Sequence, residues 1–218
     1  MSETEVHTRL SVELTQFVES LDEETVAIGD VLDAISDRGF GLILLILALP
    51  AALPLPAPGY ATPFGIMMAV LAFQMMRGRA TPWFPARVRR RTISKSKLAW
   101  TVRNAGIPLR FAEWIIRPRL SGLARNRGFL ALVGFIVLLM SISMSMPIPL
   151  TNTAPSFVIF VLAAGILEED GLVLVGGLLL APIAAGIAGV AVYFAWTHGL
   201  DAVEEHAKPM IKGFLGLS

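Results

Sequence analysis

Cysteine is absent from the 218 residues, and charged side chains make up only 16% of them. Without cysteine the chain forms no disulfide, no thiolate metal site and no cysteine nucleophile. A soluble domain is about a quarter charged, so this low charge and the mean hydropathy of +0.67 exclude an ordinary water-soluble enzyme. The three histidines are too far apart for a local metal motif. The composition therefore predicts a membrane protein that needs no metal or other cofactor.

The charges that are present fall into segments of opposite sign. Residues 1–38 hold ten acidic and two basic side chains, whereas residues 77–127 hold fourteen Lys and Arg and a single acid, Glu113, a formal charge of +13. Lys and Arg near membrane ends stay on the cytoplasmic side. The basic segment 77–127 and the N-terminus are therefore expected in the cytoplasm, while the nearly balanced tail, 198–218, leaves its own side open.

Two long apolar regions, 39–76 and 128–197, flank the basic segment. The first contains prolines at positions 50, 54, 56, 58 and 63, which exclude one straight helix because an interior proline removes a hydrogen bond and clashes with the preceding turn. We expect two helices, about 39–52 and 63–76, joined by a Pro-rich tip at membrane depth. Irregular backbone at that depth has to pack against protein or water.

The second apolar region repeats this plan over residues 128–167. The matched elements are Arg38-Gly39-Phe40 with Arg127-Gly128-Phe129, Leu53-Pro54-Leu55-Pro56 with Met146-Pro147-Ile148-Pro149, and Thr62-Pro63-Phe64 with Ala154-Pro155-Ser156-Phe157. Paired Pro-interrupted apolar segments at corresponding positions point to a central site in membrane proteins. The alternative is that Pro-rich turns between apolar helices resemble one another by chance.

The acidic segment 1–38 is expected to form two amphipathic helices. The first carries Leu10, Leu14, Phe17, Val18 and Leu21 on one face, and the second, between Val26 and Ile35, carries Val31, Leu32 and Ile35. Such helices dock on a partner or on the protein's own basic segment, or they form a solvated cap over the core.

These patterns together predict an all-α integral membrane protein. It has two Pro-broken, re-entrant helical hairpin repeats, 39–76 and 128–167, a transmembrane helix at 171–197, an N-terminal amphipathic helical segment at 1–38, a basic interfacial loop at 77–127 and a tail at 198–218.

Polar residues occur at both Pro-rich tips. Thr62 precedes Pro63, and Asn152 and Thr153 precede Pro155, so these side chains are expected to cap helices that begin near the prolines. Two helix N-termini that face one another would attract an anion or a polar substrate; alternatively the polar groups only satisfy backbone freed by the prolines. The candidate site residues are Gly59, Thr62, Pro63, Thr151, Asn152 and Thr153, and the helix-breaking residues are Pro54, Pro56, Pro58, Pro147, Pro149 and Pro155.

Aromatic residues alternate with cations in the basic segment, a pattern suited to anionic lipid headgroups. The predicted headgroup contacts are Arg87, Arg89, Arg90, Arg91, Lys95 and Lys97. The segment either orients and anchors the protein or recognises a phosphate-bearing lipid or sugar carrier. The lipid bilayer is thus an expected partner, and nucleic acid is not.

Catalytic motifs are missing from the sequence. There is no Asp-x-Asp pair to hold a nucleotide-bound metal and no GxxxxGK[ST] phosphate loop. The cluster from Glu168 to Asp170 is the one candidate acidic site, and it is expected to be a solvated turn between two helices. The chain is therefore expected not to be an enzyme.

Three stretches carry a resemblance to a known family. They are Gly29 to Gly41, the Pro-Trp-basic segment from Pro82 to Arg91, and the element Pro-Ile-Pro-x-x-Asn-x-x-Pro from Pro147 to Pro155. Over about residues 25–197 the sequence resembles the ExoD family of bacterial exopolysaccharide-synthesis proteins. The resemblance implies a bacterial inner-membrane protein that works with the exopolysaccharide-synthesis machinery, and it supplies no catalytic residues.

Two functions fit these observations. One is a transport or permeation component with a polar or anion site between the tips, which the polar residues there favour. The other is a non-catalytic scaffold or regulator of a polysaccharide synthase, which the acidic N-terminal segment and the basic loop favour. The substrate, the coupling ion and the oligomeric state, a homo-oligomer included, stay open at this point.

Overall fold

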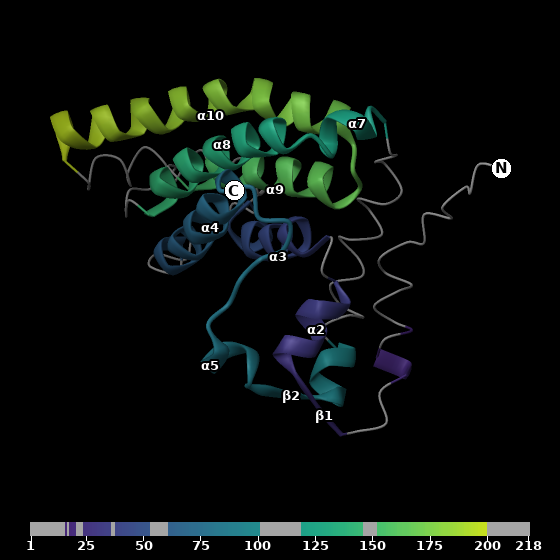
Figure 1. The fold of residues 1–218 in the computed structure, drawn as a ribbon. Helices are drawn as coiled ribbons and strands as arrows, with labels where there is room; N and C mark the ends of the chain where they lie inside the picture. The colour runs from purple at the N-terminus through teal and green to yellow at the C-terminus, as the bar shows by residue number, and fades with distance from the viewer. Residues whose placement is uncertain are drawn as a thin grey trace, which may run out of the picture.

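The computed structural model of the protein describes residues 16, 18–20, 24–35, 38–52, 61–100, 119–145 and 152–199. Five apolar helices form the main body (Figure 1). They are α3 (Gly39–Ala52), α4 (Ala61–Met76), α8 (Arg127–Ser145), α9 (Thr153–Leu167) and α10 (Gly171–His198). The first predicted helix, most of both tips and the tail lie outside the described residues.

The prolines at the helix ends lie inside the helices rather than beside them. Pro50 belongs to the last turn of α3, and α4 begins at Ala61, two residues before Pro63. The predicted bounds of the first helix, 39–52, are therefore confirmed, whereas the helix expected to start at Pro63 begins two residues earlier. A proline is tolerated in a first turn because the N–H groups there have no intrahelical partner to lose.

The two closest helix pairs each join a helix of the first predicted hairpin, 39–76, to a helix of the second, 128–167. The most extensive contacts join α4 to α8 and α3 to α9, while α10 packs mainly on α9. Glycine brings the backbones close at both pairings: Gly41 of α3 faces Leu167 of α9, and Gly65 of α4 faces Ser145 of α8. In each pair the start of one helix meets the end of the other, so both pairs are antiparallel.

The core between these helices is apolar. Its largest fully buried side chains include Leu44 from α3, Met68 from α4, Val137 from α8, Ile159 from α9 and Leu174 from α10. One continuous cluster joins all five helices. Burial of apolar area is the dominant favourable contribution to packing in water, but the outer surface of the same helices is apolar as well.

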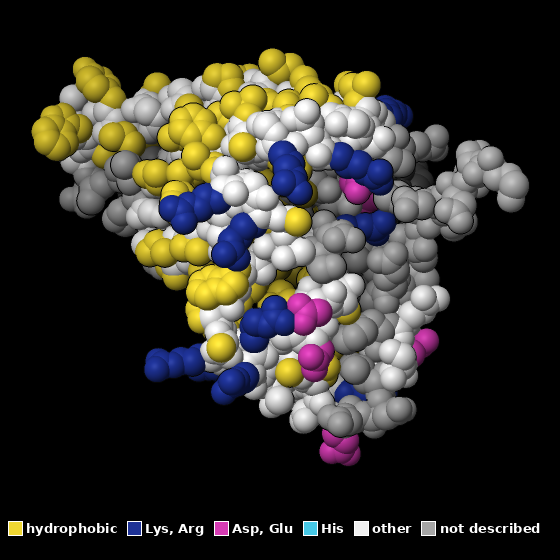
Figure 2. Space-filling view, in the orientation of Figure 1, with side chains coloured by type: hydrophobic (Ala, Val, Ile, Leu, Met, Phe, Trp, Pro, Cys, Tyr) yellow, Lys and Arg dark blue, Asp and Glu magenta, His cyan; other side chains and the backbone are white. Residues whose placement is uncertain are grey.

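The outward faces of α8 and α10 carry large hydrophobic side chains (Figure 2). Both helices are long and apolar enough to cross a membrane, and in their most apolar stretches only 33% of α8 and 28% of α10 is buried. Exposed residues on them include Phe135, Leu139, Leu179, Ile183 and Val190. Apolar patches of this extent mark surfaces that water does not cover. The chain thus has two candidate membrane-spanning helices within a mostly helical fold.

A small unit lies on the side of α3 that faces away from α10 (Figure 1). It contains β1 (Thr25–Ala27), α2 (Ile28–Ala34), α5 (Ala86–Arg89) and β2 (Thr92–Ser94). The strands are antiparallel, with Val26 opposite Ile93, and Val26 is buried with Val18 and Leu98.

This unit corrects and refines the prediction for the N-terminal segment. The helix expected from Val26 begins only at Ile28, because residues 25–27 pair as a strand with the basic segment. Asp33 of α2 also forms a salt bridge with Arg89 of α5. Of the alternatives for this segment, docking on the protein's own basic segment is the one that the structure supports.

The contact between α3 and α9 leads to a paired test of packing. A Cβ added at Gly41 would lie 2.7 Å from the Leu167 nitrogen and 2.9 Å from its Cα, whereas one added at Gly186 in α10 would meet nothing within 4 Å. We expect Gly41→Ala to lower the free energy of unfolding by about 1–3 kcal/mol, because backbone has to move. Gly186→Ala should preserve or raise it by up to about 1 kcal/mol through helix propensity. Thermal denaturation in detergent measures both, and equal midpoints would contradict the close helix contact.

Candidate functional site at the proline-flanked helix ends

The starts of α4 and α9 lie at the same end of the helix bundle. The Thr62 hydroxyl donates to the Ser145 carbonyl oxygen at 3.4 Å, which links the first turn of α4 to the last turn of α8. Thr62 lies within α4, which begins at Ala61. The prediction that Thr62 caps a helix starting at Pro63 is therefore wrong, and its hydroxyl bridges two helices instead.

Asn152 occupies the N-cap position of α9 but makes no capping hydrogen bond. Its backbone has φ −96° and ψ −44°, which is helical, whereas a capping residue has extended backbone that aims its side chain at the next N–H groups. The Ser156 hydroxyl instead donates to the carbonyl oxygens of Asn152 at 2.6 Å and Thr153 at 3.0 Å. Thr153 is the first residue of the helix itself, so the expected caps at Asn152 and Thr153 are also wrong.

The side chain of Asn152 is left with an unused acceptor. Its Oδ1 atom is buried and has no hydrogen-bond partner among the described residues. An unpaired buried acceptor costs about 1–3 kcal/mol. Buried polar atoms of this kind call for a specific explanation, and one explanation is a ligand that supplies the missing donor.

The structure places only part of the predicted site at this end of the bundle. Thr62, Pro63, Asn152, Thr153 and Pro155 are described and lie at the ends of α4 and α9. The remaining predicted residues, Gly59, Thr151, Pro54, Pro56, Pro58, Pro147 and Pro149, lie outside the described residues. The approach of the two tips to each other therefore stays a prediction.

The acidic cluster lies at the opposite end of the bundle and holds the turn between α9 and α10. Asp170 is 2% exposed, and its Oδ1 accepts from the backbone N–H groups of Leu172 at 2.9 Å and Val173 at 3.3 Å. Glu169 pairs with Arg125 at 2.8 Å. The turn is thus a buried helix cap rather than the solvated turn expected, and within the described ranges no three His, Asp or Glu residues are grouped to hold a metal.

The predicted headgroup cations have different surroundings. Arg89 is engaged by Asp33, whereas Arg87, Arg90, Arg91 and Lys97 are exposed and Lys95 is half-buried. Their contact with lipid stays a prediction, with Arg89 the least available of the six.

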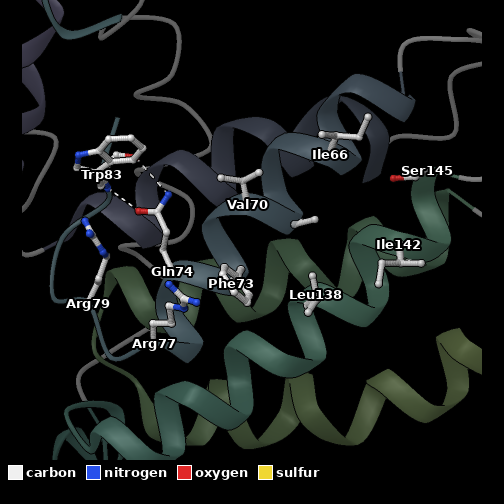
Figure 3. Close-up of a pocket in the computed structure, with 11 residues that line it drawn as sticks. Ile66, Val70, Phe73, Gln74, Arg77, Arg79, Trp83, Leu138, Ile142 and Ser145 are labelled. Atoms are coloured by element: carbon white, nitrogen blue, oxygen red, sulfur yellow. Dashed lines mark hydrogen bonds between the residues drawn. The ribbon is translucent and has the colours of Figure 1, made fainter. Parts of the chain in front are cut away.

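Sequence reasoning missed a groove of about 670 Å³ between α4 and α8 (Figure 3). Gln74 of α4 fixes one end of it, because its side-chain amide donates to the Trp83 carbonyl oxygen at 3.2 Å and its Oε1 accepts from the Trp83 N–H at 2.6 Å. The signal in the sequence was Gln74, which lies within an apolar run. Glutamine is rarely buried unless its polar atoms have hydrogen-bond partners.

Comparison with known proteins places the chain among exopolysaccharide proteins. The sequence model of the family described as "Exopolysaccharide synthesis, ExoD" matches residues 10–190. An uncharacterized protein of Synechocystis sp. is 38% identical over 206 residues, which covers 94% of this chain and 96% of that protein. Protein ExoD of Rhizobium meliloti is 31% identical over 192 residues, 85% of this chain and 76% of its own length. No solved structure matches the chain.

Two asparagines at helix starts provide a matched test of this geometry. Asn126 precedes α8, and its Oδ1 accepts from the Phe129 N–H at 3.0 Å, so Asn126→Ala should lower the free energy of unfolding by about 1 kcal/mol. Asn152→Ala should not lower it, because the buried acceptor has no partner to lose among the described residues. Thermal unfolding of both variants in detergent compares them. An equal loss in Asn152→Ala would show that its side chain is a cap after all.

Proposed function

The chain belongs to the ExoD family of exopolysaccharide-synthesis proteins, and from this premise we propose that it is a membrane transport or permeation component rather than an enzyme. Its site lies at the end of the bundle where α4 and α9 begin. The observation that carries this proposal is the buried Oδ1 of Asn152 at the start of α9, which has no hydrogen-bond partner among the described residues.

The electrostatics of this end support a polar or anionic substrate. A helix N-terminus carries about half a positive charge and unsatisfied N–H groups, and α4 and α9 both begin here. The described residues of this end include the hydroxyls of Thr62, Ser145 and Ser156 and the amide of Asn152, but no carboxylate. Amides and hydroxyls can bind and orient a polar molecule through hydrogen bonds, but at neutral pH they do not act as a general acid or base as a carboxylate does. A site of this kind suits passage of a substrate better than catalysis on it.

The distribution of charge supports a fixed orientation in a bacterial inner membrane. In sequence, α3, α4, α9 and α10 contain no Asp, Glu, Lys or Arg, and α8 contains only Arg127, its first residue. The described parts of the basic segment and of the acidic N-terminal segment lie toward the opposite end of the bundle from Asn152. By the positive-inside rule that charged end is cytoplasmic, so the Asn152 end faces the other side of the membrane.

The helix pairing supports the internal repeat. If α3–α4 and α8–α9 are equivalent units, exchanging them turns the α3–α9 contact into the α8–α4 contact, which is the other major pairing observed. Two units related in this way would place the starts of α4 and α9 in equivalent positions around a shared axis. Binding sites at repeat interfaces are common in transporters.

A scaffold or regulator of a polysaccharide synthase is the second candidate. The small unit formed by β1, α2, α5 and β2 favours it, because this unit presents exposed Arg87, Arg90 and Arg91 outside the apolar bundle. Such a surface suits an acidic partner. The two candidates predict opposite sets of damaging substitutions.

The deciding experiment compares polymer yield per unit of membrane protein in cells that depend on this chain. We expect Asn152→Ala and Thr62→Val each to lower the yield about fivefold, as loss of one substrate hydrogen bond of ~1 kcal/mol would. The matched controls are Asn126→Ala, which removes a true cap, and Thr197→Val, which removes an exposed hydroxyl whose hydrogen bonds to described residues all lie within the last turns of α10. Both controls should retain the yield per protein.

The scaffold candidate predicts the reverse result. Replacement of Arg89, Arg90 and Arg91 by Gln would then abolish polymer production while both tip variants stay active. Normal yield from Asn152→Ala and Thr62→Val at normal protein level would overturn the transport proposal.

A further inference from the structure

The groove between α4 and α8 is apolar along its length. Its lining comes from Ile66, Ala69, Val70 and Phe73 of α4 and from Leu138, Ile142 and Ser145 of α8, with Gln74, Arg77, Arg79 and Trp83 at one end. Ile66, Val70 and Phe73 are each about half exposed. The groove therefore opens on the outer surface of two apolar helices, where hydrocarbon reaches it.

One end of the groove is cationic. The Arg77 guanidinium lies 4.6 Å from the centre of the Phe73 ring, and the Arg79 guanidinium lies 5.9 Å from the centre of the Trp83 ring. Both arginines are exposed, and neither forms a salt bridge with a carboxylate in the part of the chain that the structure describes. Figure 3 shows both arginines gathered with Trp83 at the same end, with the apolar side chains extending away from them.

This cationic end is held in place by backbone and side-chain bonds. Gly78 has φ +70°, a conformation that glycine adopts at little cost, and its N–H donates to the Met75 carbonyl oxygen at 2.9 Å, which ends α4. Gln74 then fixes Trp83 through two hydrogen bonds. Arg77 and Arg79 therefore lie on a turn whose backbone is held by hydrogen bonds, so less backbone conformational entropy is lost when they bind a ligand.

We propose that this groove binds an anionic membrane phospholipid, with the phosphate at Arg77 and Arg79 and one acyl chain along α4 and α8. Arginine recognises phosphate through paired charge-assisted hydrogen bonds. The helix from Ile66 to Arg77 spans about 16 Å at 1.5 Å per residue, close to the half-thickness of a ~30 Å hydrocarbon core. The groove reaches Ser145 at the Asn152 end, but its cationic end lies at the other end of α4, and the proposal does not depend on the transport proposal.

The two arginines favour a lipid over another copy of the chain in this groove. A second apolar helix would fill the apolar part but would have to bring its own anion to the cationic end. An anionic phospholipid supplies the chain and the negative charge in one molecule, at the depth where α4 meets the basic segment. Trp83 suits the same depth, since tryptophan is enriched at membrane interfaces.

The test is lipid binding to the purified full-length chain in detergent, followed by native mass spectrometry. Phosphatidylglycerol and phosphatidylcholine with identical acyl chains are titrated separately. We expect wild-type protein to bind phosphatidylglycerol about tenfold more tightly, a difference that corresponds to ~1.4 kcal/mol. The double variant Arg77→Gln, Arg79→Gln should lose this preference. The matched control Arg119→Gln, Arg127→Gln removes two exposed arginines outside the groove and should keep it.

Two further arms separate the groove from diffuse charge attraction. Val70→Trp fills the groove at a half-exposed position and should abolish phosphatidylglycerol binding while both arginines remain; its thermal midpoint verifies folding. Glycerol 3-phosphate, which has the headgroup charge without acyl chains, should not displace the lipid. The proposal is overturned if the control pair loses the preference equally, if Val70→Trp still binds phosphatidylglycerol, or if glycerol 3-phosphate displaces the lipid. It is also overturned if the wild-type chain is a dimer that Val70→Trp dissociates, because the groove would then hold a second copy of the chain.

Discussion

The constraint on which the rest of this structure depends is that the helices are apolar on both sides. Their inward faces form one core, while only 33% of the most apolar stretch of α8 and 28% of that of α10 is buried. Such a surface suits hydrocarbon better than water, and in hydrocarbon the backbone has to satisfy its own hydrogen bonds, which helices do. Apart from Arg127 at the start of α8, charged side chains are accordingly absent from these five helices.

Close packing without a hydrophobic driving force in lipid requires small residues at the contacts. Gly41 against Leu167 and Gly65 against Ser145 meet this need, and they join helices from different halves of the sequence. The same crossing brings the starts of α4 and α9 to one end of the bundle. The helix pairing thus places Asn152, whose buried Oδ1 has no partner in the part of the chain that the structure describes, at the end where α4 also begins.

The sequence predicted the helices well because apolar runs and prolines act locally. It located α3, α4 and α10 to within about two residues. It did not predict β1, since residues 25–27 become a strand only by pairing with residues 92–94, far away in the chain. The caps at Thr62 and Asn152 were wrong because capping depends on backbone angles that residue type does not fix. The groove was missed because the hydrogen bonds between Gln74 and Trp83 that fix one end of it are a tertiary contact, which neither residue indicates in the sequence.

The central claim is that the charged end is cytoplasmic and that α10 crosses the membrane. The natural absence of cysteine allows single cysteines at Ser96 and Ser121, on the charged end, and at Thr197, at the far end of α10, to be labelled with an impermeant thiol reagent. In intact cells we predict labelling at Thr197→Cys alone, and labelling at Ser96→Cys and Ser121→Cys only after the inner membrane is permeabilised. Labelling of Ser96→Cys and Ser121→Cys in intact cells, with Thr197→Cys protected, would contradict the account.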